Sequence, residues 1–323
     1  MKFRTETEIA PLRAQIDYRS RIVALGSCFA ENMAGRLAAA KFRVAANPFG
    51  AMFNPESIAG AAMRAAERRH VAAEELHRGA NGYFHYDFHG KFTAASPDEA
   101  VARMNAAVDE AHEALAAADT VILTLGTAWV FRLRENGRTV ANCHKQPAAL
   151  FRREMLGADE TAGILARLAE GPLAGKRIIM TVSPVRHLAD GLDGNFLSKA
   201  TLRVAVAEAA ARCPGAEYFP AYEIVCDDLR DYRFYADDMV HPSAQAVEYV
   251  WEKFSAAALS DDARAAAARV QALTAAAAHR PLHPGSEAHK EFCRRTIAAM
   301  EAMPEVDFGQ ERKKLSDDLQ INS

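Results

Sequence analysis

The sequence predicts an α/β fold in which helices flank a mostly parallel sheet as a three-layer sandwich, followed by a C-terminal helical extension. Short apolar runs alternate with helical segments over residues 1–258, which we take as one domain, and several of the runs end at a glycine. This alternation is typical of parallel sheets, because parallel strands need a crossover connection. Residues 259–323 are helical and alanine-rich, with a break near residues 280–285, and we expect them to pack on the domain.

The individual elements follow from apolar runs, capping residues and turn signals. Strands are expected at residues 21–25, 42–46, 120–125, 177–182 and 217–225, the last interrupted by Pro220 and therefore placed at an edge. Helices are expected at residues 29–41, from 54 toward 70, and at 97–118, 158–170, 197–212 and 243–254. An inserted hairpin is expected near residues 82–93, around His89-Gly90, and a second around Asn136-Gly137.

Composition and charge argue against several classes of protein. The formal net charge is -3, which does not favour binding to nucleic acid or to an anionic membrane. No apolar run is long enough to cross a bilayer, and none follows the N-terminal charges as in a signal peptide. The five cysteines are scattered and lack the spacing of a metal site. We therefore expect a cytoplasmic protein with reduced thiols, no metal and no cofactor.

Ser27 stands where the first expected strand gives way to the first helix. Active sites in open α/β sheets lie beyond the carboxyl ends of the strands. A serine at a helix N-terminus is also close to unpaired N–H groups that favour developing negative charge. Ser27 is therefore a candidate nucleophile, although a helix cap is the commoner role for such a serine taken alone.

A second candidate group precedes the helix expected at residues 243–254. Asp238 lies three residues before His241, and a carboxylate at that spacing can accept a hydrogen bond from imidazole Nδ1 within a short loop. Nε2 is then free to take a proton from a serine. Asp237 is a rival to Asp238, and an acidic loop with an exposed histidine is the alternative interpretation.

The two groups together resemble the serine hydrolases called SGNH or GDSL, which carry a Gly-Ser after the first strand and an Asp-x-x-His-Pro before the last helix. The run Gly26-Ser27-Cys28-Phe29-Ala30 is moreover similar to the signature of the GSCFA family, which looks like a branch of that superfamily. The resemblance runs from about residue 22 to the helix after His241, and it includes residues 47–50, 124–127, 142–145 and 183–187. It implies a flavodoxin-like sandwich.

The resemblance also implies roles for individual residues. Ser27 is expected as the nucleophile, His241 as the general base and Asp238 as the acid that orients the base. The backbone N–H groups of Ser27 and Gly50 are expected to line the oxyanion hole.

The sequence departs from the superfamily after the strand at 120–125. Where the superfamily has Gly-x-Asn, this chain has Gly126-Thr127-Ala128, and alanine offers no side-chain donor to the oxyanion. Because a missing donor costs about 100- to 1000-fold in rate, we expect another group to replace it. Asn142 is the first choice and Thr127 the second.

Three further residues are candidate substrate contacts: Asn47, His144 and His187, each of which follows a strand or a hairpin. Polar turns and structural histidines are the alternative interpretation. Cys28 is a rival nucleophile, because thiolates at helix N-termini attack readily. Cysteine is also among the most buried residue types, and we expect Cys28 to turn inward from the cleft.

The expected activity is hydrolysis of an O-acyl ester through an acyl-serine intermediate. The superfamily resemblance implies a short acyl group on a carbohydrate or another small molecule as the substrate. Two alternatives stay open. An O-acyltransferase would use the same triad, and a non-catalytic carbohydrate-binding module would keep the fold with a site degraded at Ala128.

Overall fold

Five parallel strands form the central sheet of the computed structural model, which describes residues 4–13 and 15–320. Their order is β10-β9-β5-β1-β2, and each neighbouring pair is parallel. The bounds are β1 Arg21–Gly26, β2 Arg43–Ala46, β5 Thr120–Leu125, β9 Arg177–Val182 and β10 Ala216–Tyr218. The predicted α/β class and parallel sheet are confirmed.

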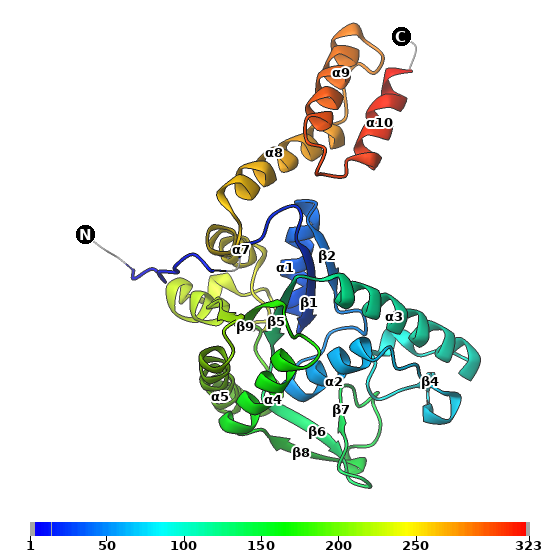
Figure 1. Ribbon diagram of the computed structural model, residues 1–323, viewed down its shortest axis with the longest axis vertical. Coiled ribbons are helices and arrows are strands. Elements are labelled where there is room, and N and C mark those ends of the chain that lie inside the picture. Colours follow the sequence, from blue (N-terminus) through cyan, green and yellow to red (C-terminus); the bar gives the residue numbers. More distant parts are fainter. Residues whose placement is uncertain (1–3, 14, 321–323) are drawn as a thin grey trace.

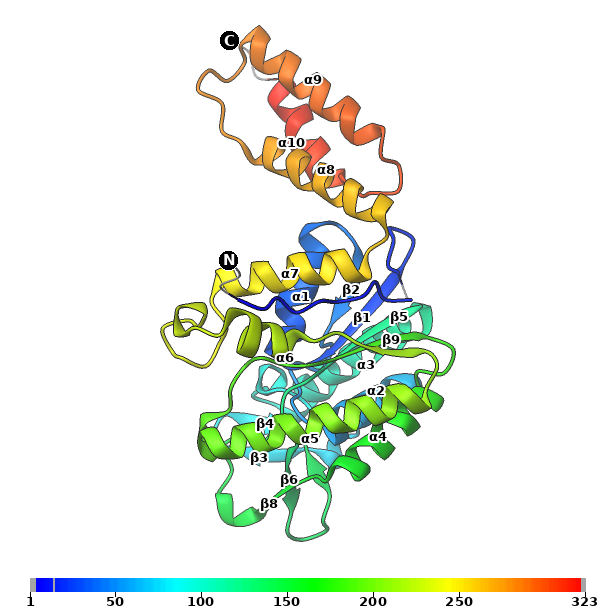
Figure 2. The same ribbon diagram turned by 90° about the vertical axis from the view of Figure 1, so that its left-hand side faces the viewer.

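Helices cover both faces of this sheet (Figures 1 and 2). In β1, Ile22 and Ala24 point into a core shared with α1 (Cys28–Ala39) and α7 (Ala244–Ala258). Val23 and Leu25 point into the opposite core. That core is completed by α2 (Pro55–Ala66), α3 (Pro97–Ala117), α4 (Ala158–Glu170) and α5 (Gly191–Arg212). Because neighbouring residues of a strand face opposite sides, fully apolar strands require helices on both sides.

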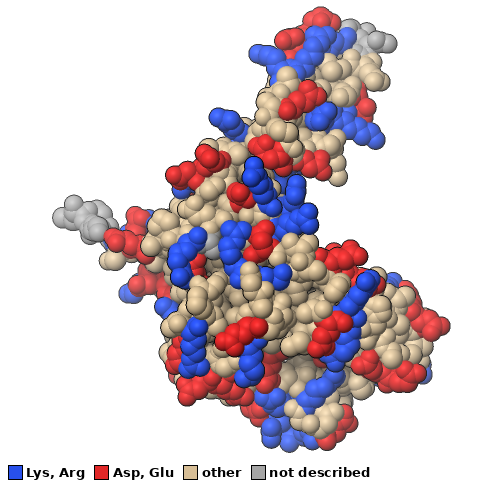
Figure 3. Space-filling view, in the orientation of Figure 1, with Lys and Arg blue, Asp and Glu red and all other residues tan. Residues whose placement is uncertain are grey.

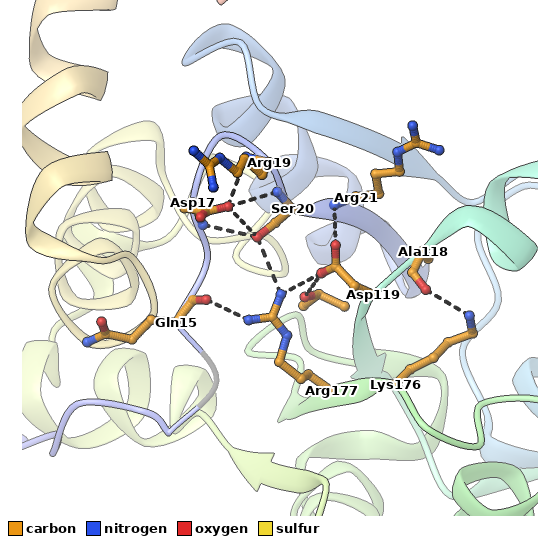
Figure 4. A network of polar contacts seen from close by, with 10 residues as sticks. Gln15, Asp17, Arg19, Ser20, Arg21, Ala118, Asp119, Lys176 and Arg177 are labelled. Atoms are coloured by element: carbon orange, nitrogen blue, oxygen red, sulfur yellow. Dashed lines mark hydrogen bonds and ion pairs between the residues drawn. The ribbon is translucent and has the colours of Figure 1, made fainter. Parts of the chain in front are cut away.

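Polar contacts fasten the amino ends of β1, β5 and β9 (Figure 4). The Asp119 carboxylate accepts hydrogen bonds from Arg21 N at 2.8 Å and from Thr120 Oγ1 at 2.6 Å. Arg177 donates to the same carboxylate at 2.6 Å and to Gln15 O at 2.7 Å. Three adjacent strands are thereby joined at the edge of the sheet that lies away from their carboxyl ends.

Two small antiparallel sheets flank the carboxyl end of the central sheet. One, of order β7-β6-β8, consists of β6 (Trp129–Leu133), β7 (Thr139–Val140) and β8 (Phe151–Met155). It confirms the hairpin expected at Asn136-Gly137 and adds a third strand that the sequence analysis did not predict. The other pairs β3 (His77–Gly79) with β4 (Gly82–Phe84).

The expected hairpin around His89-Gly90 is therefore wrong in position, since the strands meet several residues earlier. Gly82 explains the shift, because its φ is +120° and a Cβ at this position would lie 2.2 Å from Ala94 O. Only glycine tolerates that conformation and that close approach. Gly90 instead begins a single 3-10 turn, Gly90–Phe92.

The largest other differences from the expected bounds are at β10 and α5. The edge strand β10 ends at Tyr218, and Pro220 begins a helical region that includes a π-helical segment, Ile224–Leu229. Proline cannot donate to the strand ladder, which accounts for the early end. Helix α5 begins at Gly191, six residues before the expected start at residue 197.

The C-terminal extension projects from one end of the domain as α8 (Asp261–Ala278), α9 (Glu287–Glu301) and α10 (Gly309–Leu319) (Figure 1). Lys41 joins it to the domain, with Nζ 3.0 Å from a Glu311 carboxylate oxygen and 5.5 Å from the centre of the Phe308 ring. Since Lys41 precedes β2, this contact lies at the amino edge of the sheet, opposite Ser27.

Acidic and basic side chains are interspersed over the face of the molecule shown in Figure 3. Within residues 4–13 and 15–320, none of the helices combines the length and the apolar character needed to cross a membrane.

Candidate active site

Ser27 lies at the carboxyl end of β1 and caps α1. Its Oγ accepts a hydrogen bond from Phe29 N at 3.3 Å, and its own N–H donates to Thr124 O at 3.0 Å. The preceding Gly26 has φ +136°, and a Cβ on it would lie 2.1 Å from Thr124 O. The strand therefore passes into the helix through a turn that only glycine can make.

Asn47 holds this turn in place from the end of β2. Its Oδ1 accepts a hydrogen bond from Gly26 N at 2.8 Å, and its Nδ2 donates to Glu31 Oε1 at 3.1 Å. The residue is buried, with a left-handed φ of 41°. The expectation that Asn47 contacts substrate is not supported, because both ends of its side chain bind within the protein.

The two N–H groups expected in the oxyanion hole are already bonded. Ser27 N donates to Thr124 O, and Gly50 N donates to Asn47 O at 2.7 Å. Neither is a free donor in this structure. Within the first turn of α1, the N–H of Cys28 donates to no backbone carbonyl of the described chain. That N–H is at the first helical position, where helix geometry leaves donors unpaired.

Asp238 and His241 form a hydrogen-bonded pair. The Asp238 Oδ2 lies 2.7 Å from His241 Nδ1, and Oδ1 accepts hydrogen bonds from the N–H groups of Val240 and His241, both at 2.9 Å. These bonds, first of all that from the His241 backbone, lower the pKa of Asp238 to about 2. No hydrogen bond joins Asp237 to the imidazole in the described chain, so Asp238 is the partner.

The loop that carries this pair is closed by its own backbone. Ala236 N donates to His241 O at 2.7 Å, and Ser243 N donates to Phe234 O at 2.8 Å. Met239 takes a left-handed φ of 57°, which is costly for a residue with a Cβ. The imidazole and carboxylate are about half exposed. The loop therefore presents an oriented histidine to solvent.

No hydrogen bond links Ser27 Oγ to His241 in the described chain. Ser27 is only 1% exposed, whereas His241 is half exposed on its loop. The structure thus brings together the predicted acid and base, but it shows no hydrogen bond between the base and the serine hydroxyl. Catalytic hydrogen bonds are often long in unliganded enzymes and shorten when the substrate binds.

Cys28, the rival nucleophile, packs against the core shared by α1 and α7. Burial, followed by the charge of Glu31, raises the pKa of its thiol. A thiol held protonated is a poor nucleophile, so the environment of Cys28 favours the inward, structural interpretation.

The end of β5 is built around Ser198 of α5. Ser198 Oγ accepts a hydrogen bond from Ala128 N at 2.8 Å and lies 3.0 Å from Thr127 Oγ1. Thr127 Oγ1 also accepts from Trp129 N at 3.1 Å. Thr127, the second choice for the missing oxyanion donor, is therefore already engaged in this turn, and Ala128 is fully buried.

Asn142, the first choice, lies in a turn after β7. Its Oδ1 accepts from His144 N at 2.8 Å, and its backbone N donates to Tyr86 O at 3.1 Å. No hydrogen bond of its side-chain NH₂ to the protein is present in the described chain, which leaves that donor available.

His144 serves the packing of the small antiparallel sheets. Its ring stacks on Phe84, with centres 4.3 Å apart, and its Nε2 lies 3.0 Å from His85 O. Burial lowers its pKa. These contacts support a structural role rather than the expected contact with substrate.

His187 lies beyond the end of β9. Its backbone N–H donates to Asn195 Oδ1 at 3.0 Å, and its ring meets the edge of Phe53. Its Nε2 is buried without a hydrogen-bond partner in the described chain, and burial, then the charge of Lys199, lowers its pKa to about 4. An unpaired buried nitrogen is uncommon, and a substrate group is one way to satisfy it.

Lys199 is a residue at this edge that the sequence analysis missed. Its side chain is fully buried, and Nζ donates to Gly126 O at 2.6 Å and to Ser183 O at 2.7 Å. Those carbonyls follow β5 and β9, so Lys199 joins the two strand ends beside Ser27. Burial lowers its pKa to about 7. Buried polar residues occupy one face of α5, at positions 195, 198 and 199, but this burial is apparent only in the folded chain.

One group of possible metal ligands occurs in the described chain, far from Ser27, in the C-terminal extension. It consists of His289, Cys293 and Asp318. The Cys293 Sγ lies 3.6 Å from His289 Nε2 and 4.0 Å from Nδ1. A structural zinc site has four protein ligands, and this group offers three.

Comparison with known proteins agrees with the motifs. None of the curated proteins compared matches the chain. A model described as "GSCFA domain protein, C-terminal domain" matches residues 270–321, from the middle of α8 through α10. The model of the GSCFA family matches residues 21–254, from the start of β1 into α7. The chain therefore belongs to the GSCFA family.

Proposed function

We propose that the protein is a serine hydrolase related to the SGNH or GDSL enzymes, and that it cleaves an O-acyl ester on a carbohydrate or another small molecule. The observation that carries the proposal is the Asp238–His241 pair, joined at 2.7 Å on a closed loop. That bond fixes the imidazole tautomer with its proton on Nδ1, which leaves Nε2 as a base. A second support is Ser27 at the N-terminus of α1.

In the proposed reaction, Ser27 Oγ attacks the ester carbonyl while His241 Nε2 takes the hydroxyl proton. Asp238 stays ionised and stabilises the imidazolium that forms. The C–O bond to the alcohol then breaks, and His241 returns the proton to the leaving oxygen. Water, activated by His241, hydrolyses the acyl-serine in the same way.

The oxyanion would be stabilised differently from the superfamily pattern. Asparagine is replaced by Ala128, and the N–H groups of Ser27 and Gly50 are occupied. The N–H of Cys28, at the positive end of α1, is the donor we assign from the structure, and the side-chain NH₂ of Asn142 is the donor that the sequence predicts. Fewer preorganised donors predict a slow hydrolase.

Labelling with a fluorophosphonate probe tests the proposal. We expect one adduct per chain at Ser27 above pH 7, lost in Ser27→Ala and kept in Cys28→Ala. Hydrolysis of p-nitrophenyl acetate should follow the same pattern. If folded protein gives no adduct and no turnover, the hydrolase proposal is wrong.

Two observations favour a second candidate, the non-catalytic carbohydrate-binding module. Ser27 and His241 are not hydrogen-bonded, and the position of the oxyanion asparagine is a buried alanine. Under that alternative, the protein would bind sugars without labelling.

We also propose that the protein works in the cytoplasm. All five cysteines are free thiols, which is typical of a reducing compartment.

A further inference from the structure

A cavity of about 240 Å³ lies beside the loop that carries Asp238 and His241. Arg186 joins the cavity wall to that loop, since its N–H donates to Val240 O at 3.1 Å and its Nη1 to Met239 O at 3.3 Å. Tyr235, another wall residue, pairs as a β-bridge with Pro242. The cavity and His241 are therefore parts of one local structure.

The wall combines ring faces with a few polar groups. Its aromatic residues are Phe196, Tyr222, Tyr232 and Tyr235, and both Phe196 and Tyr232 are 61% exposed at its rim. Leu192, another wall residue, is 49% exposed, and exposed apolar side chains that gather in one place often mark a binding site. Apolar faces beside a small number of polar groups are typical of a site for a ring-shaped organic ligand.

The polar part of the wall carries one uncompensated positive charge. Arg230 pairs with Asp227, and Asp231 pairs with Arg233 at 3.7 Å. Arg186 has no carboxylate partner in the described chain. Its guanidinium carbon lies 3.8 Å from the centre of the Tyr235 ring and 5.2 Å from that of Tyr232. A guanidinium packed against two aromatic rings, with unused donors, suits a carboxylate ligand.

The place of the cavity also indicates which part of an ester it receives. In the proposed reaction His241 delivers its proton to the leaving oxygen, so the alcohol part must lie on the side of His241. The cavity shares Arg186 and Tyr235 with the loop that carries His241, and this contact is the basis for assigning the alcohol part to it.

We propose that the cavity binds the leaving alcohol and that this alcohol is a sugar ring carrying a carboxylate, bound by Arg186. The inference rests on the proposed function and names its substrate class. When the C–O bond breaks, the sugar oxygen takes its proton from His241, and the sugar acid leaves through the cavity while the acyl group stays on Ser27.

A matched pair of substrates tests this. Methyl glucuronide and methyl glucoside, each acetylated at the same hydroxyl, differ only in the carboxylate. We expect kcat/KM to favour the glucuronide by about 10- to 100-fold, the value of a charge-assisted hydrogen bond. In Arg186→Gln, which keeps a donor for Met239 O, the ratio should fall to near one. Arg203→Gln, whose arginine pairs with Glu223 outside the cavity, should keep the ratio.

A binding measurement separates this inference from the hydrolase proposal. Titration calorimetry of methyl glucuronide into Ser27→Ala should show binding that Arg186→Gln in the same background removes. Ester hydrolysis without preference for the glucuronide would overturn the sugar-acid inference alone. Arg186-dependent binding in a protein that neither labels nor hydrolyses would overturn the hydrolase proposal and leave the cavity assignment standing.

Discussion

Replacing Gly26 by alanine should be among the most damaging single changes in the domain. At φ +136° an L-residue is strained by about 1–3 kcal/mol. The new Cβ would also lie 2.1 Å from Thr124 O and 2.8 Å from Thr124 C, both backbone atoms of the central strand β5, which cannot turn aside. The strands must separate, which strains the packing and stretches the bond from Ser27 N to Thr124 O.

Overpacking of this kind costs about 1–3 kcal/mol and the weakened hydrogen bond about 1 kcal/mol, so we expect a total loss of about 3 to 7 kcal/mol. Urea unfolding followed by circular dichroism measures it. Gly35→Ala is the matched control, because Gly35 lies within α1 and a Cβ there meets nothing within 4 Å. That variant should be up to about 1 kcal/mol more stable. Equal unfolding midpoints for Gly26→Ala and wild type would refute the reasoning.

Four further predictions concern other parts of the site. Asp238→Asn should lower ester turnover at least about 100-fold with unchanged folding, as expected when a triad acid is lost. Asp237→Asn is the control and should retain turnover. Equal effects of the two substitutions would show that Asp238 is not the acid that orients His241. The pKa of Asp238 is lowered to about 2, so its carboxylate should stay charged between pH 4 and 8. Protonation of Asp238 should therefore not limit wild-type turnover in that range. An NMR titration that shows Asp238 taking up a proton between pH 4 and 8 would contradict this prediction. Iodoacetamide should alkylate Cys28 slowly at pH 7, since burial raises the pKa of the thiol; mass spectrometry showing it as the fastest of the five cysteines would reverse this assignment. Asn47→Ala should cost about 2 kcal/mol in thermal or urea unfolding, because it leaves the buried Gly26 N–H without an acceptor, and no loss of stability would show that the bond is dispensable.

Helices and strands that are marked by one continuous apolar or periodic run could be predicted from the sequence. The strands β5 and β9 and the helix α4 have the expected bounds, because each is an apolar or periodic run bounded by turn residues. β8 was missed, since its interior is Arg152-Arg153-Glu154 and only its ends are apolar. The start of α5 was hidden by Gly191 and Gly194, which have weak helix propensity.

Some features of the candidate site could likewise be predicted from the sequence, and others could not. The Asp238–His241 pair was predictable because the partners are only three positions apart in the sequence. The occupied N–H groups of Ser27 and Gly50 were not, since their acceptors belong to contacts that only the folded chain reveals. Lys199 was missed because a single lysine in a helix is ordinarily solvated, and its burial depends on where the ends of β5 and β9 meet α5.

The network of Asp119 and Arg177 at the amino ends of the strands has a consequence for how this fold can be altered. Asp119 and Arg177 join β1, β5 and β9 at their amino ends, away from the glycine turn, the left-handed loop and the cavity. Libraries that vary the exposed rim residues Leu192, Phe196 and Tyr232 should therefore yield mostly folded proteins, so that substrate preference can be redesigned at the rim with little loss of stability.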